Sequence, residues 1–254
     1  MEIPLTFSSD PSVRISSSNT PENFTTTLSK PLILPSNKSY EIALHSLNMS
    51  YSWYNIEPSR GNNLIKYYNG IEWKDISFVA GIYSYSDINN YIHDTLLTNG
   101  DYSVVLGENT FNINLDFSVS SFLVSISISN DYQLDLVSQA FADLLGFDNG
   151  IITALQSSVR LPNITNSLEN IYVHTSLVQE SIVDGQYSDT IFVFSTANLN
   201  RSFAFQKEPT NLLWQPFMGN VVSRVQFYVT DFSGRIINLN GIATSFTVII
   251  RVKK

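Results

Sequence analysis

The chain has 254 residues, a formal net charge of −8 and only 14% charged residues. Its 14 Lys and Arg residues are too few for the large basic face that nucleic-acid binding requires, so we expect no direct nucleic-acid binding. The absence of cysteine excludes disulfide frameworks, thiolate metal sites and cysteine nucleophiles.

The N-terminal stretch contains a short strand-like run, IPLTF, followed by a polar segment without a core pattern. We therefore expect part of residues 9–22 to form an extended arm or loop. The chain opens without a basic and then apolar signal segment, and no stretch approaches the roughly 18 apolar residues of a membrane-spanning helix. We expect no membrane span.

Alternation of apolar and polar residues, together with 13% aromatic residues, favours β-sheets along most of the chain. Eight strands are predicted outside residues 70–160, near 3–8, 24–29, 40–49, 170–178, 190–196, 201–206, 221–230 and 245–252. Eight antiparallel strands in two packed sheets make a jelly roll, so the predicted fold is an all-β single jelly-roll sandwich.

Residues 70–160 also contain the two segments with a helical pattern. SYSDINNYIHDTLLTNG has one apolar stripe along a helix, and LVSQAFADLLGF ends at Gly146, a typical left-handed stop. Between them, TFNINLDF and SFLVSISIS alternate, with Phe122 expected on the inner face of the second. We expect residues 70–160 to form a small α+β insertion in a sandwich of residues 1–69 and 161–254.

Two late strands carry further expectations. TIFVFST is apolar on both faces, which is typical of a strand buried between layers. The last strand alternates, so that Phe246, Val248 and Ile250 are expected inward and Arg251 outward. The tight turns around Gly234 and Gly241 precede it.

No motif points to catalysis. His45, His93 and His174 form no local metal motif, and we interpret His45 and His174 as strand residues rather than metal ligands. The carboxylates lie mainly in turns and on polar helix faces, where a solvated role is expected. We therefore expect no enzyme activity, no cofactor and no metal site.

Some residues suit an interface. The aromatic run YSWYNI fits a sugar-stacking platform, a buried strand end or a subunit contact, and the basic C-terminus fits a solvated end or a tail laid on an acidic neighbour. The interface candidates are Trp53, Tyr54, Trp214, Arg251, Lys253 and Lys254.

Several segments resemble the penton, or minor capsid, proteins of polintons, adintoviruses and virophages. The similarity begins in SSNTPENFTTTLSKPLILPSNKSYEIALHSLNMSYSWYNI and continues through GIYSYSDINNYIHDTL and FADLLGFD. It ends in IYVHTSLVQESIVDGQYSDTIFVF and VQFYVTDFSGRIINLNGIATSFTVIIRV. The run NMSYS departs from the family pattern H-Y-P-H before the tryptophan.

This resemblance implies a single jelly-roll vertex protein of the virion, assembled inside the host cell as a homopentamer. It implies double jelly-roll major capsid trimers as neighbours, with a fibre or receptor-binding protein as a further candidate partner. In such an assembly, we expect the arm or loop at residues 9–22 to touch an adjacent subunit. Two other functions stay open: a different virion component, such as a cement or receptor-binding spike protein, and a carbohydrate-binding or hydrolytic β-sandwich.

Overall fold

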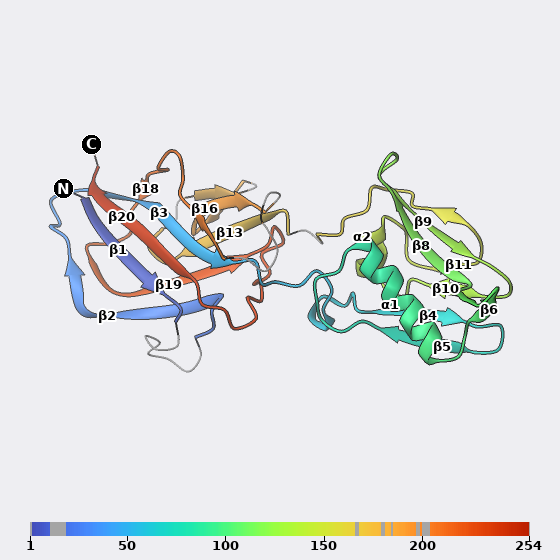
Figure 1. Ribbon diagram of the computed structural model, residues 1–254. Coiled ribbons are helices and arrows are strands. Elements are labelled where there is room, and N and C mark those ends of the chain that lie inside the picture. The colour runs from blue at the N-terminus through green and yellow to red at the C-terminus, as the bar shows by residue number, and fades with distance from the viewer. Residues whose placement is uncertain are drawn as a thin grey trace. The chain divides into compact units, whose positions relative to one another are not determined.

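The structure is a computed structural model that describes residues 2–10, 19–165, 168–178, 181–183, 185–196, 199 and 204–253. The chain divides into two compact units, and both helices and most of the strands are labelled in Figure 1. Unit 1 joins Met1–Trp53 to Ser167–Lys254, and unit 2 is the intervening segment Tyr54–Asn166.

Unit 1 is built from two antiparallel sheets. In the first, with the order β1-β20-β3-β17, the strands are β1 (Glu2–Ser8), β20 (Ser245–Val252), β3 (Tyr40–Ser50) and β17 (Ala204–Lys207). In the second, with the order β2-β19-β13-β16, they are β2 (Asn23–Ile33), β19 (Val221–Thr230), β13 (Asn170–Thr175) and β16 (Thr190–Ser195). Smaller elements are β18 (Gln215–Pro216), which pairs with β3, and the hairpin of β14 (Ser181–Val183) and β15 (Gln186–Ser188).

The connections between these eight strands are those of a jelly roll. Successive strands change sheets at every step except from β13 to β16, so that strands far apart in sequence become neighbours. The last strand, β20, for example, lies between β1 and β3. Unit 2 is inserted between β3 and β13. The predicted fold class, an all-β jelly roll with a small α+β insertion carrying two helices, is therefore confirmed.

The core of unit 1 is an aromatic stack between the two sheets. Alternation along β20 buries Phe246, Val248 and Ile250, as predicted. The Phe246 ring lies parallel to that of Phe227 from β19, with their centres 4.9 Å apart, and Phe24 of β2 stacks on both. Because these rings come from opposite sheets, their contact holds the two layers together.

Two expectations for unit 1 differ from the structure. The strand β16 was predicted to be buried on both faces, but it lies at a sheet edge, where Val193 is 41% exposed. Of the expected arm at residues 9–22, residues 11–18 lie outside the described part of the chain. Ser9 at its start exchanges hydrogen bonds with Thr244, and Asn19 near its end bonds to the backbone of Thr25, so both ends are fixed to the same sandwich.

Unit 2 is built from short antiparallel sheets. One has the order β11-β10-β4-β5, with β11 (Ile151–Ile152), β10 (Gln133–Asp135), β4 (Leu64–Tyr68) and β5 (Trp73–Ser77). Another has the order β12-β9-β8, with β12 (Gln156–Ser157), β9 (Leu123–Ile128) and β8 (Ile113–Ser118). The third is the hairpin of β6 (Ser103–Val105) and β7 (Glu108–Thr110). A single 3-10 turn spans Pro58–Arg60.

The two helices form where the pattern predicts them. The helix α1 (Tyr85–Thr98) begins with a capping box between Ser84 and Asp87 and buries Ile88, Ile92 and Leu96. The helix α2 (Gln139–Leu145) has Ser138 as its N-cap and ends at Gly146, which has a φ of 77°. Within the described part of the chain, neither helix has the length and hydropathy needed to cross a membrane.

Unit 2 also departs from the expectations. Residues 54–69 and 161–166 were predicted to belong to the sandwich, but they group with the insertion. In the first range β4 pairs with β5 and β10, and in the second the Asn163 N–H donates to Asp143 O. Phe122 was predicted to face inward from a strand, whereas it lies in the β8–β9 turn with a φ of 56° and is 60% exposed.

Candidate interaction surface

The C-terminal end of β20 brings together two of the residues predicted for an interface. Arg251 lies opposite Glu41 of β3 in the strand register, and its Nε donates a 2.5 Å hydrogen bond to Glu41 Oε1. Its guanidinium lies 3.6 Å from the centre of the Trp214 ring. Trp214 is held there because the next two residues form β18, which pairs with β3 beside Glu41. The result is a half-buried aromatic, cation and carboxylate stack.

A second cation stands next to this stack. Lys253 is exposed, and its backbone N–H donates to Ser39 O at 2.9 Å. Lys253 and Lys38 line a hollow of about 330 Å³ with Tyr40, Pro216 and Phe217. Since Glu41 already neutralises Arg251, Lys38 and Lys253 are, among the described residues, the cations of this surface that can attract an acidic group.

Of the other interface candidates, only Trp53 can be compared with this surface within unit 1. Trp53 is 1% exposed and belongs to the core of unit 1, where its ring stacks on Tyr51 at 4.2 Å. Its prediction as an interface residue is wrong, because the packing of its own subunit covers the side chain. Tyr54 is half-buried in unit 2, and Lys254 lies outside the described residues.

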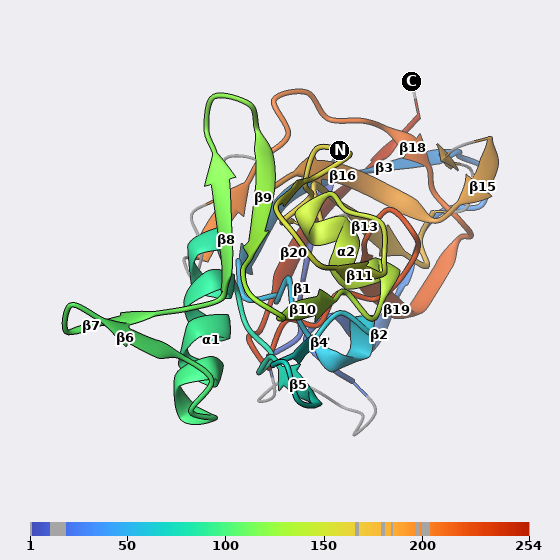
Figure 2. The same ribbon diagram turned by 90° about the vertical axis from the view of Figure 1, so that its right-hand side faces the viewer.

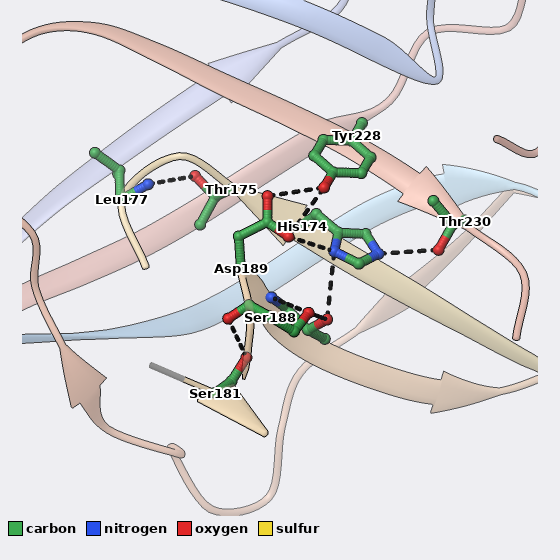
Figure 3. A network of polar contacts seen from close by, with 9 residues as sticks. His174, Thr175, Leu177, Ser181, Ser188, Asp189, Tyr228 and Thr230 are labelled. Carbon is green, nitrogen blue, oxygen red and sulfur yellow. Dashed lines mark hydrogen bonds and ion pairs between the residues drawn. The ribbon is translucent and has the colours of Figure 1, made fainter. Parts of the chain in front are cut away.

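The outer face of the second sheet carries a polar network around His174, shown in Figure 3. His174 Nδ1 lies 2.9 Å from Asp189 Oδ1, and Nε2 lies 2.9 Å from Thr230 Oγ1. The Tyr228 ring stacks on the imidazole at 4.4 Å, and its hydroxyl donates to both oxygens of Asp189 at 2.8 and 2.9 Å. The network ties β13 to β19 and to the residue that precedes β16.

Electrostatics favour a charged Asp189 in this network. Partial burial alone would raise its pKa, but the bonds from His174 and Tyr228 outweigh that effect and hold the pKa below its ordinary value. Burial, together with the neighbouring carboxylate, raises the pKa of the Tyr228 hydroxyl well above its usual range. Asp189 is therefore ionised at neutral pH, so His174 donates to it through Nδ1–H.

The order of groups, carboxylate to imidazole to hydroxyl, is the one that activates a nucleophile in hydrolases. Here, however, His174 is 9% exposed and Thr230 is 3% exposed, so the hydroxyl is buried. We therefore assign the network to bracing three adjacent strands. Among the residues that the structure describes, no group of three or more His, Asp and Glu side chains is arranged to hold a metal ion.

Sequence reasoning identified Trp214, Arg251 and Lys253 but missed their partners. Glu41 and Lys38 lie more than two hundred residues before the C-terminus, and only the pairing of β3 with β20 brings them close. His174 was interpreted correctly as a strand residue. Its contacts with Asp189 and Thr230 depend on a β-bulge at Val173/His174, which no alternating pattern reveals.

Comparisons with known proteins bear on the fold. No protein-family model matches the chain, and no curated protein matches its sequence. Among solved structures, the chain is similar to the SeMet-labeled mavirus penton protein, with a TM-score of 0.56 and 10% sequence identity over 100% of both chains. The resemblance noted in the sequence is thereby confirmed at the level of the fold.

Proposed function

We propose that this chain is a penton, or minor capsid, protein that closes the fivefold vertices of an icosahedral capsid as a homopentamer. The observation that supports this is the full-length likeness to the mavirus penton protein, which extends over both units. A jelly roll by itself occurs in many functions. A jelly roll that carries an α+β insertion between its third and fourth strands, and matches over its whole length, is a narrower criterion.

The physical properties of the sandwich suit a ring of five. Such a ring repeats one head-to-tail contact, and it closes only if the angle between two faces of each subunit is constant. The aromatic stack between the sheets and the network around His174 both resist changes in that angle. With 14% charged residues, the chain also has few charges to desolvate at an interface.

We place Trp214 and Lys253 among the residues that contact neighbours in the capsid. Lys253 lines the hollow at the end of β20, where Lys38 adds a second cation, and Trp214 packs on Arg251 of the same strand. The surrounding subunits would be trimers of a double jelly-roll major capsid protein, and the vertex is the site where a fibre or receptor-binding protein would dock. The protein would therefore be found in the virion after assembly inside the host cell.

The carbohydrate-binding alternative has less support. Stacking on a sugar needs an open aromatic face, but Trp53 is buried and Arg251 covers one face of Trp214. Trp73, which is 43% exposed, is the tryptophan with the most open ring. A cement or spike protein would be distinguished by its position in the particle.

A reconstruction of purified particles tests the proposal directly. We expect density for this chain around the fivefold axes, and sedimentation of the purified protein at five times its mass of 28.5 kDa. Density between capsomers or with threefold symmetry would favour the cement or spike function instead. A protein that is monomeric at all concentrations and absent from particles would overturn the proposal.

A further inference from the structure

The β6–β7 hairpin of unit 2 exposes a continuous apolar run. Val104, Val105 and Leu106 are 61%, 54% and 101% exposed. The other strand residues of the hairpin, Ser103 and Glu108–Thr110, are exposed as well. Single exposed apolar residues are ordinary on protein surfaces, but consecutive ones are unfavourable unless they have a function. Figure 2 shows the hairpin projecting away from α1 and from β8.

The backbone at the tip of this hairpin is unusual for its sequence. Leu106 and Gly107 form the two-residue turn, with φ angles of 53° and 88°. This corresponds to a type I′ turn, for which Asn-Gly is the common pair. A leucine at the first position strains the backbone because its Cβ approaches the carbonyl. The chain therefore keeps a bulky apolar side chain where folding favours a polar one, and retained strain of this kind points to function.

A second hairpin of unit 2 repeats the feature. The described non-glycine residues with positive φ are Leu106, Phe122, Asn130 and Asn240. Asparagine is common in this conformation, whereas leucine and phenylalanine are exceptions. Phe122 lies in the β8–β9 turn, where it is 60% exposed beside Val119, which is 74% exposed. Two hairpins of one unit thus present apolar turn residues in a strained conformation.

The charge of unit 2 restricts what can bind there. Residues 54–166 contain twelve Asp and Glu residues against four Lys and Arg residues, whereas the remainder contains ten of each, so the net charge of −8 belongs to unit 2. Nucleic acid and anionic lipid would be repelled by such a unit. A second copy of the chain offers either the same negative unit or a sandwich without net charge. Charge complementarity therefore favours a different, positively charged protein.

We propose that the β6–β7 tip anchors a different protein through an apolar pocket set in a positively charged surface. Leu106 enters the pocket. Glu108, two residues later at the start of β7, faces the surrounding cations. An apolar anchor supplies most of the affinity in such contacts, while the charges raise the association rate and exclude wrong partners. Phe122 provides a second anchor of the same kind. The inference does not depend on the position of the chain at a vertex.

Photo-crosslinking in the full-length protein tests this inference. Benzoylphenylalanine at Val104, beside the tip, is irradiated both in the cells that make the protein and in purified particles. We expect one predominant crosslinked product, formed with a different protein whose docking face is basic. The yield of this product should fall at least tenfold in the L106N variant. It should fall as much when the NaCl concentration around the purified particles is raised from 0.1 to 0.5 M. The matched control places the crosslinker at Ile71, an 84% exposed residue in the β4–β5 turn of the same unit, and should not give this product.

Other outcomes would overturn the inference. These are the absence of a product, a product between two copies of this chain, a product with lipid or nucleic acid, and a product that L106N leaves unchanged. Thermal unfolding of L106N separates binding from folding. Because asparagine tolerates positive φ, the Tm should stay the same or rise by about 1–3 °C. A Tm lowered by more than about 5 °C would show that Leu106 serves the fold, and would also overturn the inference.

Discussion

The guanidinium carbon of Arg251 lies 3.6 Å from the centre of the Trp214 ring while Nε of the same side chain donates to Glu41. Arg251 was predicted to contact a neighbouring subunit, but its side chain binds Glu41 and Trp214 of its own subunit. Arg251→Ala should destabilise the isolated chain by about 1–3 kcal/mol, since it removes a cation–π contact and leaves the largely buried Glu41 unpaired. Urea unfolding measures the loss.

Two further variants check this explanation. Arg251→Lys keeps the charge but loses the planar fork, so it should restore only part of the stability. Arg224→Ala removes an exposed arginine of β19 and should change the stability by less than about 0.5 kcal/mol. Equal losses for Arg251→Ala and Arg224→Ala would mean that the stack contributes nothing.

The position of β20 between β1 and β3 gives the second prediction. Phe246→Ala should cost about 3–5 kcal/mol and Val248→Ala about 2–4 kcal/mol, because both side chains are fully buried in a central strand. Ile249→Ala, on the outward face of the same strand, is the control and should cost less than half as much as Phe246→Ala. Chemical denaturation of the three variants measures the order, and similar losses at all three positions would contradict the assigned inner face.

Stability against acid gives the third prediction. Burial alone would raise the pKa of Asp101, but bonds donated by Tyr67, Lys74 and Asn69 outweigh it and hold the pKa below its ordinary value of 3.8. Asp189 in unit 1 is shifted in the same direction. Because the unfolded chain then binds protons more tightly than the folded one, this stabilisation is complete above the ordinary pKa and is lost as the pH falls through the folded pKa.

Asp101→Asn isolates the effect in unit 2. The variant should be less stable than the parent by about 1–3 kcal/mol at pH 7, and the difference should shrink as the pH falls below about 4. Thermal unfolding at pH 7, 4 and 3 measures it. Asp94→Asn, which removes an exposed carboxylate from α1, serves as the control. A difference that stays constant over this pH range would show that the hydrogen bonds, and not the charge, stabilise the site.

How far the sequence predicts the structure depends on how local the cause is. Alternating or continuous apolar runs located the eight strands of the jelly roll, and capping residues located both helices, because a strand or a helix end depends on residues close together in the chain. Trp53 was misassigned since its burial depends on Tyr51 and on Phe205, about 150 residues away. The same holds for Arg251 and Glu41, which strand pairing makes neighbours.

Phe122 illustrates a different limit. The run SFLVSISIS alternates from its first apolar residue, and so it predicts a strand that already includes Phe122. In the structure β9 begins one residue later, at Leu123, and Phe122 takes the left-handed conformation of the turn. Turn residues are usually recognised by glycine, asparagine or proline, so a turn that carries phenylalanine gives no such signal.

The end of α2 gives the last prediction, in which two glycines with nearly the same φ differ in their surroundings. A Cβ added at Gly146 would lie 2.2 Å from the carbonyl oxygen of Arg160, whereas a Cβ at Gly234 would have no heavy atom within 4 Å. Gly234→Ala should therefore cost about 1 kcal/mol for the left-handed backbone alone. Gly146→Ala should cost at least about 2 kcal/mol more, because the chain from Arg160 must move away from α2. Thermal unfolding of both variants compares the two costs, and equal losses would contradict the close packing of α2 against this segment.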